Sequence, residues 1–386
     1  MKRFLAMALL GVLPLAFSPQ AGVAQSKPSP TEKIDGDRLT AILTTAAGQD
    51  DAHTAATLSD LELTERLDPK RFAQLSASVP GDKSRQALVI LADSAALLEP
   101  AKAEVLAKPQ PDAAALRQML VNVVNYANNA LHGLPNFIAT RATTAFEDRP
   151  NEDVLEPTGI VSYSYLPLHA VNRVSTQVAY RSGHEVLESN GKDIQRSSPT
   201  HGLRTAGEFG PFLSTVLSDA VKGKITWARW EQGTDGADAV FHYEVNKDAS
   251  HYVIQFCCTR EDVGESIPTH IYSEKTGYGG EIAFNPATGA VMRISVQAEL
   301  TPGELVSSAG MVVEYAPVQV GEKTVVLPVK SVSILRAHTA APPEGMHMAT
   351  FKGPAKTFLN DVIFQNYHQF RGEMRMVDDG AGSANQ

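Results

Sequence analysis

The hydrophobic pattern of this chain changes at one short break, Leu134-Pro135-Asn136, and that change limits the folds it can adopt. Before the break, apolar residues recur at helical spacing. After it, apolar and polar residues alternate in short runs rich in Thr, Val and aromatic residues. A period of two is typical of strands with one face in a core. The sequence therefore predicts an α+β fold, in which an N-terminal helical domain precedes an antiparallel β-sheet.

The helical domain is expected over residues 37–133, with four or five helices. Asp68-Pro69 and Pro111-Asp112 are helix-start signals, because Asp caps free backbone N–H groups and Pro suits the first turn. Gly133 is a stop signal for the last helix. A further apolar stripe, interpreted as helical, comprises Leu58, Leu61, Leu63 and Leu67.

The β-rich domain is expected over residues 134–376. Strands spaced about 8–12 residues apart indicate an antiparallel meander that curves into a half-barrel-like sheet. The helix Pro211–Lys222, stopped by Gly223, is expected to cross this sheet. Strands are expected at Ile138–Phe146, Val174–Tyr180, Ile225–Trp230, Val240–Val245, Tyr252–Cys258, Glu281–Phe284, Val291–Ala298, Met311–Tyr315, Thr324–Leu327, Val332–Leu335 and Val362–Phe370.

The clearest local signal is the hairpin turn within 284–290. Pro286 sets the turn and Gly289 supplies the positive φ that such turns need. The strand after it alternates strictly, so one face should be apolar and the other polar. The apolar set is Met292, Ile294, Val296 and Ala298, and the polar set is Arg293, Ser295, Gln297 and Glu299.

The first 24 residues have the order of a secretory signal peptide. Lys2 and Arg3 precede an apolar run, and small residues end at Ala24, near the expected cleavage site. We expect a periplasmic or secreted protein, with a flexible leader at 25–36 and a disordered tail at 377–386. No later segment is apolar for long enough to span a membrane, so the cleaved chain should not be transmembrane.

Net charge and cysteine content bear on nucleic-acid binding and on disulfide formation. The formal net charge of −9 argues against nucleic-acid binding. The only two cysteines, Cys257 and Cys258, are adjacent, and neighbouring side chains in a strand point to opposite faces. Two separate thiols are therefore favoured over a disulfide, with a strained vicinal disulfide acting as a redox switch as the alternative. The sequence does not indicate an oligomeric state.

No catalytic or metal-binding motif emerges, and no cofactor is expected. The histidines lack the four-residue helical spacing of zinc proteases, and no Cys-x-x-Cys occurs. The sequence therefore favours a protein that is not an enzyme. The alternative is a secreted hydrolase with a loop-borne site, formed by His184 with Glu185 or by His201 with Glu208.

Aromatic residues gather on the expected strands. Most such residues simply fill a core. On a curved sheet that does not close, they would instead line an apolar trough able to hold an acyl chain. Trp227 and Trp230 are three residues apart, so we expect them on opposite faces, with at most one in the trough. The trough candidates are Trp227, Phe241, Tyr243, Tyr252, Phe256, Phe284 and Tyr315.

Four strings of the chain resemble an uncharacterised family of exported bacterial proteins: 61–67 (LELTERL), 134–141 (LPNFIATR), 207–210 (GEFG) and 227–233 (WARWEQG). The β-rich half also resembles half-barrel envelope proteins such as periplasmic lipoprotein carriers, through 180–183, the 280–286 hairpin and 313–315. That second resemblance implies a half-barrel and the handling of lipids.

Together these features predict an exported envelope protein that binds an apolar, lipid-like ligand or an envelope protein partner without catalysis. Two alternatives stay open. One is the secreted hydrolase. The other is a structural adaptor that acts through its helical domain, 37–133.

Overall fold

The computed structural model describes residues 31–156, 159–181, 184–189, 192–193, 203, 207–234, 236–257, 271–301, 305–340 and 352–369. The predicted signal peptide, the predicted disordered tail and Cys258 lie outside these residues, as do the side chains of Phe256 and Cys257.

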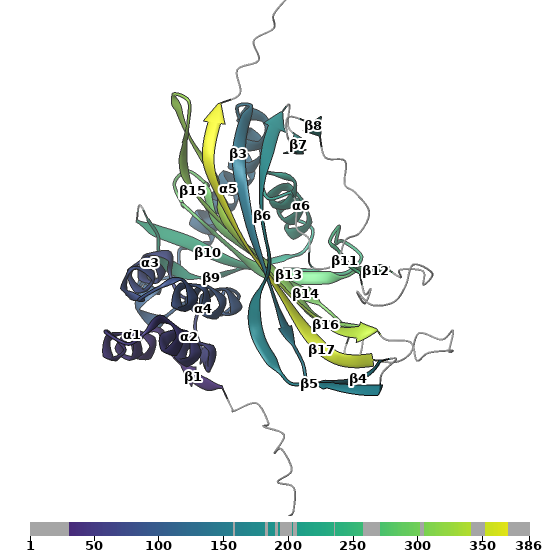
Figure 1. The fold of residues 1–386 in the computed structure, drawn as a ribbon. Helices are drawn as coiled ribbons and strands as arrows, with labels where there is room; N and C mark the ends of the chain where they lie inside the picture. Colours follow the sequence, from purple (N-terminus) through teal and green to yellow (C-terminus); the bar gives the residue numbers. More distant parts are fainter. Residues whose placement is uncertain are drawn as a thin grey trace, which may run out of the picture. The chain divides into compact units, whose positions relative to one another are not determined.

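The main element is an open antiparallel sheet of eleven strands, which confirms the predicted fold class (Figure 1). Its edge strands, β8 and β9, do not pair with each other. The last strand of the chain, β17, lies between β3 and β16. In spatial order the strands are β8 (Lys192–Asp193), β7 (His184–Ser189), β6 (Leu166–Arg181), β3 (Phe137–Arg149), β17 (Lys352–Gln369), β16 (Lys323–Ala340), β15 (Val306–Val320), β14 (Val291–Glu299), β13 (Gly277–Phe284), β10 (Ala237–Val245) and β9 (Lys224–Gln232).

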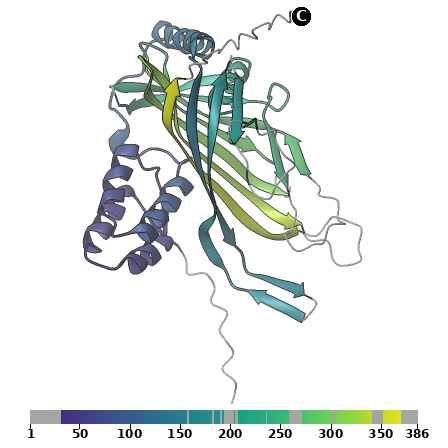
Figure 2. The same ribbon diagram turned by 45° about the horizontal axis from the view of Figure 1, so that its top comes forward.

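Several strands are longer than the sequence predicts. The two strands expected at 324–327 and 332–335 form the single strand β16. Its register against β15 shifts at Pro328, between the pairs Glu314–Lys330 and Tyr315–Pro328. Such an irregularity accommodates a residue that has no N–H to donate. Two short hairpins pair separately: β4 (Glu152–Glu156) with β5 (Gly159–Tyr163), which extends away from the main sheet in Figure 2, and β11 (Val253–Cys257) with β12 (Ile271–Lys275).

The first four α-helices share a core of their own. Aspartate side chains cap three of them, because each accepts backbone N–H bonds of the first turn. Asp68 does so ahead of Pro69, as predicted. The core of this helical segment is centred on Leu39, Leu58 and Leu88, which are almost fully buried. The helices are α1 (Gly36–Thr45), α2 (Asp51–Ser59), α3 (Pro69–Ser78) and α4 (Asp82–Ser94).

Two expectations for this region are wrong. The stripe expected to be helical contains the strand β2 (Leu61–Leu63), in which Leu61 and Leu63 alternate into the core. It pairs in parallel with β1 (Glu32–Ile34), so residues 32–36, expected in a flexible leader, form β1 and begin α1. Pairing over three residues needs both strands together, and neither run carries a strong signal alone.

The two remaining α-helices, α5 (Ala113–Gly133) and α6 (Pro211–Ala220), pack on the apolar face of the sheet. Val123 and Ala127 of α5 belong to the same core as Ile294 of β14. The sequence predicts this helix as part of the helical domain, but its apolar face contacts the sheet instead. The helix at 211–220 lies against the sheet, as predicted.

The turn after β13 holds α5 in place. Gly289 has a φ of 75°, as predicted. Asn122 of α5 donates from its Nδ2 to the carbonyl oxygen of Pro286 at 3.1 Å. A Cβ on Gly289 would lie 2.2 Å from the backbone oxygen of Asn122, so α5 and the turn meet backbone to backbone.

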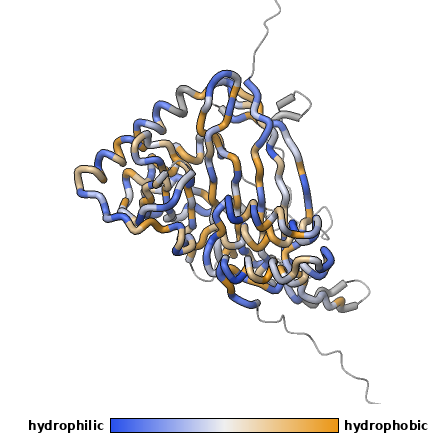
Figure 3. The backbone as a smooth tube through the Cα atoms, turned by 90° about the vertical axis from the view of Figure 1, so that its left-hand side faces the viewer, coloured by the Kyte–Doolittle hydropathy of each residue, from blue (hydrophilic) through white to orange (hydrophobic). Residues whose placement is uncertain are grey.

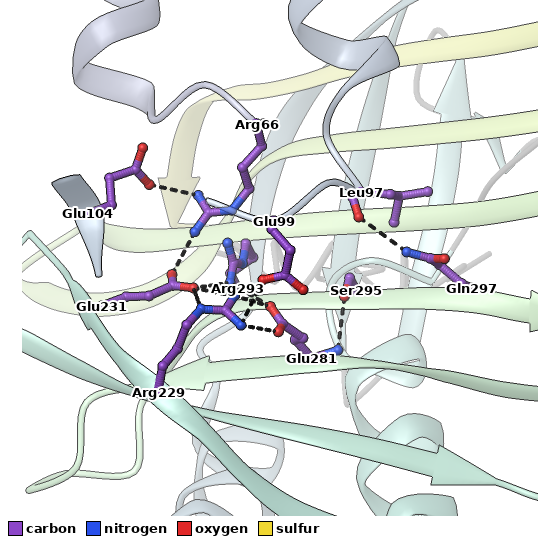
Figure 4. Close-up of polar contacts among 10 residues, drawn as sticks. All are labelled: Arg66, Leu97, Glu99, Glu104, Arg229, Glu231, Glu281, Arg293, Ser295 and Gln297. Atoms are coloured by element: carbon purple, nitrogen blue, oxygen red, sulfur yellow. Dashed lines mark hydrogen bonds and ion pairs between the residues drawn. The ribbon is translucent and has the colours of Figure 1, made fainter. Parts of the chain in front are cut away.

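The strand β14 has the two predicted faces from Arg293 onward, but at its start Val291 and not Met292 lies in the core, because the register against β13 shifts between Ala283 and Phe284. Ile294 and Val296 are fully buried in the core under α5 and α6. Arg293 and Ser295 lie on the other face (Figure 4). Figure 3 shows hydrophobic and hydrophilic residues alternating along the strands of the sheet.

Candidate functional site

An apolar pocket lies between α5, α6 and the three strands β9, β10 and β13. Its volume is about 460 Å³, within the range of roughly 300–1,000 Å³ that small-molecule sites occupy. Asn125 carries the only polar side chain of the lining. The lining residues are Leu120, Val121, Val123, Val124, Asn125, Leu217, Ala220, Val221, Ile225, Phe241, Ile282 and Phe284.

The pocket opens to solvent beside three exposed valines on α5 and at the end of α6. Val121 and Val124 of α5 are 49% and 38% exposed, and Val221, directly after α6, is 64% exposed. Single exposed valines are ordinary on a protein surface. Three that line one pocket form a continuous apolar surface, which is typical of a binding site.

The floor of the pocket consists of packed, buried aromatic rings. Phe241 and Phe284 stack with ring centroids 5.5 Å apart, and both side chains are almost completely buried. Ile282 lies beside them in the same core. Because these rings also pack into the core beneath, the floor is formed without a ligand.

The structure divides the predicted trough residues. Phe241 and Phe284 line the pocket, whereas Tyr243 and Tyr315 lie in the core that the sheet forms with α5 and α6. The Tyr243 hydroxyl donates to the backbone oxygen of Ser295 at 2.6 Å, and the ring of Tyr252 packs on Tyr278. Tyr315 is buried away from the pocket, in the core beside Leu213.

The prediction that Trp227 and Trp230 face opposite sides of the sheet is wrong. Their ring centroids lie 5.0 Å apart, and Trp227 also packs edge-on against Phe241. The register between β9 and β10 passes from Val240–Arg229 to Phe241–Trp227, which leaves Ala228 as an extra residue. This β-bulge breaks the alternation and brings both rings to the apolar face.

The opposite face of the sheet carries a buried network of charges (Figure 4). Arg229 of β9 donates two hydrogen bonds to the Glu281 carboxylate of β13, at 2.6 and 2.7 Å. It also donates to Glu231 at 2.6 Å, and Arg293 of β14 reaches both carboxylates. Burial opposes the charge on Arg229, but Glu281 and Glu231 together raise its pKa.

This network joins the helical segment to the sheet. Arg66, between β2 and α3, donates to Glu231 at 2.7 Å and pairs with Glu104 at 3.3 Å. Glu104 belongs to the short 3₁₀ helix η1 (Lys102–Glu104), and Glu99 pairs with Arg229 at 3.0 Å. Burial raises the pKa of Glu231, but the three arginines together outweigh burial and bring the pKa below its usual value. The carboxylate therefore stays ionised. In this network each arginine pairs with at least one glutamate, and the pairs link the helical segment to the sheet.

The hydrolase candidates are only partly described. Glu208 is fully buried and accepts from Arg141 of β3 at 2.9 Å. Burial and, next, the charge of Glu208 raise the pKa of Glu185 to about 7. The side chain of His184 and all of His201 lie outside the described residues. Neither predicted histidine–glutamate pair is therefore tested.

A polar cluster that the sequence did not predict lies at the end of α6. Asp219 is fully buried and accepts from the His251 backbone N–H at 2.8 Å and from the Tyr278 hydroxyl at 2.9 Å. Its other oxygen lies 2.5 Å from Nδ1 of His251. Burial raises the pKa of Asp219, but these bonds lower it below its usual value. The cluster fixes the end of α6 that borders the pocket.

Two features are absent from the described residues. No group of three or more His, Cys, Asp or Glu side chains among them could hold a metal ion. Among the helices described, none combines the length and the hydrophobicity needed to cross a bilayer.

Comparisons with known proteins give one distant similarity of fold. No protein-family model matches the sequence, and no curated protein matches it, so the predicted family resemblance stays a prediction. Among solved structures, the chain is similar to a LolA superfamily protein from Nitrosomonas europaea, with 7% sequence identity. The match covers 66% of this chain and 94% of that one, with a TM-score of 0.26. At that score the likeness is too distant to carry an argument about function.

Proposed function

We propose that this protein binds an apolar ligand, without catalysis, in the pocket between α5 and α6. The observation that carries the proposal is the pocket itself: about 460 Å³, open to solvent and lined by eleven apolar side chains and one amide. Each CH₂ group that a ligand buries there contributes about 0.8 kcal/mol of transfer free energy. An apolar chain therefore gains affinity from the lining without specific polar contacts.

The chemistry of the lining supports binding rather than catalysis. Catalytic pockets combine an acid, a base or a nucleophile within reach of one another. Here Asn125 is the single polar side chain of the lining, and the buried acids Glu208 and Asp219 are both engaged elsewhere. The proposal also includes export to the cell envelope, because 1–24 reads as a secretory signal peptide.

The test is ligand binding by the protein, which is produced with its predicted signal peptide in a Gram-negative host and purified from the periplasm. After delipidation, the protein is titrated with a fluorescent anthroyloxy fatty acid, and native mass spectrometry gives the stoichiometry. We expect saturable binding of one ligand and a rise in the midpoint of thermal unfolding, since a ligand stabilises the state that it binds.

A matched pair of variants locates the site. Val121→Glu puts a carboxylate in the pocket mouth, and Val171→Glu makes the same change on β6 at similar exposure, 47% against 49%. Desolvating the new charge should weaken binding by on the order of tenfold or more in the first variant and leave the second unchanged. Equal binding by both variants, or no saturable binding by the unaltered protein, would contradict the proposal.

A further inference from the structure

A second buried cluster of charges lies where α4 meets the polar face of the sheet. The Nζ atom of Lys330 in β16 lies 2.6 Å from Oδ1 of Asp93, in the last turn of α4, and 3.3 Å from Oδ1 of Asp361 in β17. Asp93 is only 2% exposed. The same ammonium group lies 5.4 Å from the centre of the Phe72 ring in α3. One lysine of the sheet therefore contacts two helices of the helical segment.

The cluster holds more negative charge than positive charge. Asp93 and Asp361 share one ammonium group, and Glu314 of β15 lies opposite Lys330 on one side and Arg293 on the other. Oδ2 of Asp93 and Oδ1 of Asp361 are buried and accept no hydrogen bond from the described residues. A buried carboxylate with too few donors is unfavourable in its ionised form. The arrangement is therefore best satisfied when one of its carboxyl groups carries a proton.

Asp93 is the carboxyl group placed to take that proton. Burial raises its pKa to about 7; Lys330 acts to lower this pKa, and Asp361 and Glu314 act to raise it. Burial lowers the pKa of Lys330, but Asp93 and Asp361 together raise it above its usual value, so the lysine stays charged.

The charged groups of the other elements against α4 are engaged elsewhere. Asp51 of α2 accepts hydrogen bonds from Ser84, near the opposite end of α4. Arg71 of α3 and Glu62 of β2 form ion pairs with residues of α1 and β1. The balance of charge around Asp93 is therefore set by the sheet.

Polar contacts of this kind matter because the helical segment has its own core. Among the described residues, that core contains no side chain of the main sheet. On the sheet, the segment covers the face that carries Lys330: a Cβ on Gly310 would lie 2.4 Å from Cδ1 of Leu97, which follows α4. Interfaces within a chain that rely on polar contacts permit relative motion of the two parts.

We infer that Asp93, Lys330 and Asp361 form a pH-sensitive latch, through which the helical segment docks on the sheet with uptake of one proton and undocks as the pH rises. Undocking exposes Asp93 to water, where the pKa of an aspartate is about 3.9. The docked state therefore holds the proton more tightly. The latch favours docking fully below about pH 4, and this contribution is lost as the pH rises through about 7.

The experiment measures undocking by thiol labelling at a position that docking covers. Val332 lies two residues after Lys330 in β16, so it is on the same face, and it is 4% exposed. Ser331 points to the opposite face and is fully buried there. Val332→Cys and Ser331→Cys are therefore matched reporters, placed in the full chain with Cys257 and Cys258 replaced by serine.

Labelling uses 4,4′-dithiodipyridine between pH 5 and pH 8, and the ratio of the two rates controls for the effect of pH on thiol reactivity. Val312→Cys, opposite Val332 in β15, is a second reporter of the covered face. Thermal unfolding confirms that each variant is folded.

We expect labelling at position 332, relative to position 331, to rise by on the order of tenfold or more from pH 5 to pH 8. Asp93→Asn keeps the shape of a protonated carboxyl group and should abolish this rise. Asp82→Asn, at a fully solvated position of the same helix, should leave it unchanged. The latch is overturned if Asp93→Asn keeps the pH profile, if both reporters are labelled in parallel, or if neither position 332 nor position 312 is labelled at any pH.

Discussion

Arg66 and Glu231 meet at 2.7 Å although 165 residues separate them along the chain. Both side chains are almost fully buried between the helical segment and the polar face of the sheet. Burying a charge is unfavourable unless it is paired with an opposite charge and hydrogen-bonded. Glu231 forms ion pairs with three arginines, Arg66, Arg229 and Arg293. This acid is therefore the centre of the contact that holds the helical segment on the sheet.

Replacing Arg66 should loosen that contact. Arg66→Met removes the ion pairs that Arg66 forms with Glu104 and Glu231 and leaves both carboxylates with fewer partners. The free energy of unfolding should therefore fall by about 3 kcal/mol. Urea denaturation measures it. The control is Arg85→Met, which breaks the exposed pair with Asp82 and should lower stability by less than about 1 kcal/mol. Similar losses in the two variants would show that the network is not an anchor.

Gly289→Ala should displace α5 from the turn. A positive φ alone makes alanine unfavourable by about 1–2 kcal/mol, and here the new Cβ would also lie 2.2 Å from the backbone oxygen of Asn122. Gly48→Ala is the matched control, since its φ is 94° and nothing lies within 4 Å of the added Cβ. We expect a larger loss of stability at Gly289, measured by thermal unfolding, together with weaker binding in the pocket that α5 borders. A loss no larger than that at Gly48 would contradict the tight backbone contact.

Glu185 should make the protein less stable as the pH rises. Its pKa is about 7 in the folded protein, against about 4.3 in an unfolded chain, so the folded state holds the proton more tightly. The resulting stability is complete below about pH 4 and is lost as the pH rises through 7. Glu185→Gln removes this contribution, so the stability of the variant relative to the unaltered protein should increase from pH 5 to pH 8. Thermal unfolding across that range checks the sign, with exposed Glu62→Gln as the control that should not change the slope.

Tyr278→Phe should loosen the end of α6. The Tyr278 hydroxyl donates to the buried Asp219 carboxylate at 2.9 Å, and a hydrogen bond to a charged group contributes about 1.5–3 kcal/mol. Tyr252→Phe removes a hydroxyl from the neighbouring ring, which has no such acceptor among the described residues. The free energy of unfolding should fall clearly in the first variant and by much less in the second, because the Tyr252 ring keeps its packing and loses no hydrogen bond to a charged group. Equal effects would show that Asp219 does not depend on this donor.

The local elements follow from local chemistry, which is why the sequence alone predicts them. Asp68 caps α3 because a carboxylate next to Pro69 satisfies free N–H groups within three residues. The turn at Gly289 and the two faces of β14 depend likewise on neighbours in the chain. The α+β class and the antiparallel sheet follow from the same alternation.

The candidate site depends on contacts between distant residues. Sequence alternation places Trp227 and Trp230 on opposite faces, but a bulge at Ala228, set by pairing with β10, puts them together. The amphipathic pattern of α5 shows that one face is buried, yet either the helices before it or the sheet after it could bury that face. Only packing against Ile294 and its neighbours decides for the sheet.

The sequence by itself thus determined most strands of the main sheet, most helices and the presence of an apolar face, because these depend on spacing within a few residues. The tertiary structure decided how much of that face α5 and α6 cover, where a 460 Å³ opening remains, and which arginines meet which glutamates. Those outcomes depend on the shapes and charges of side chains brought together from remote parts of the chain, and no local pattern records them.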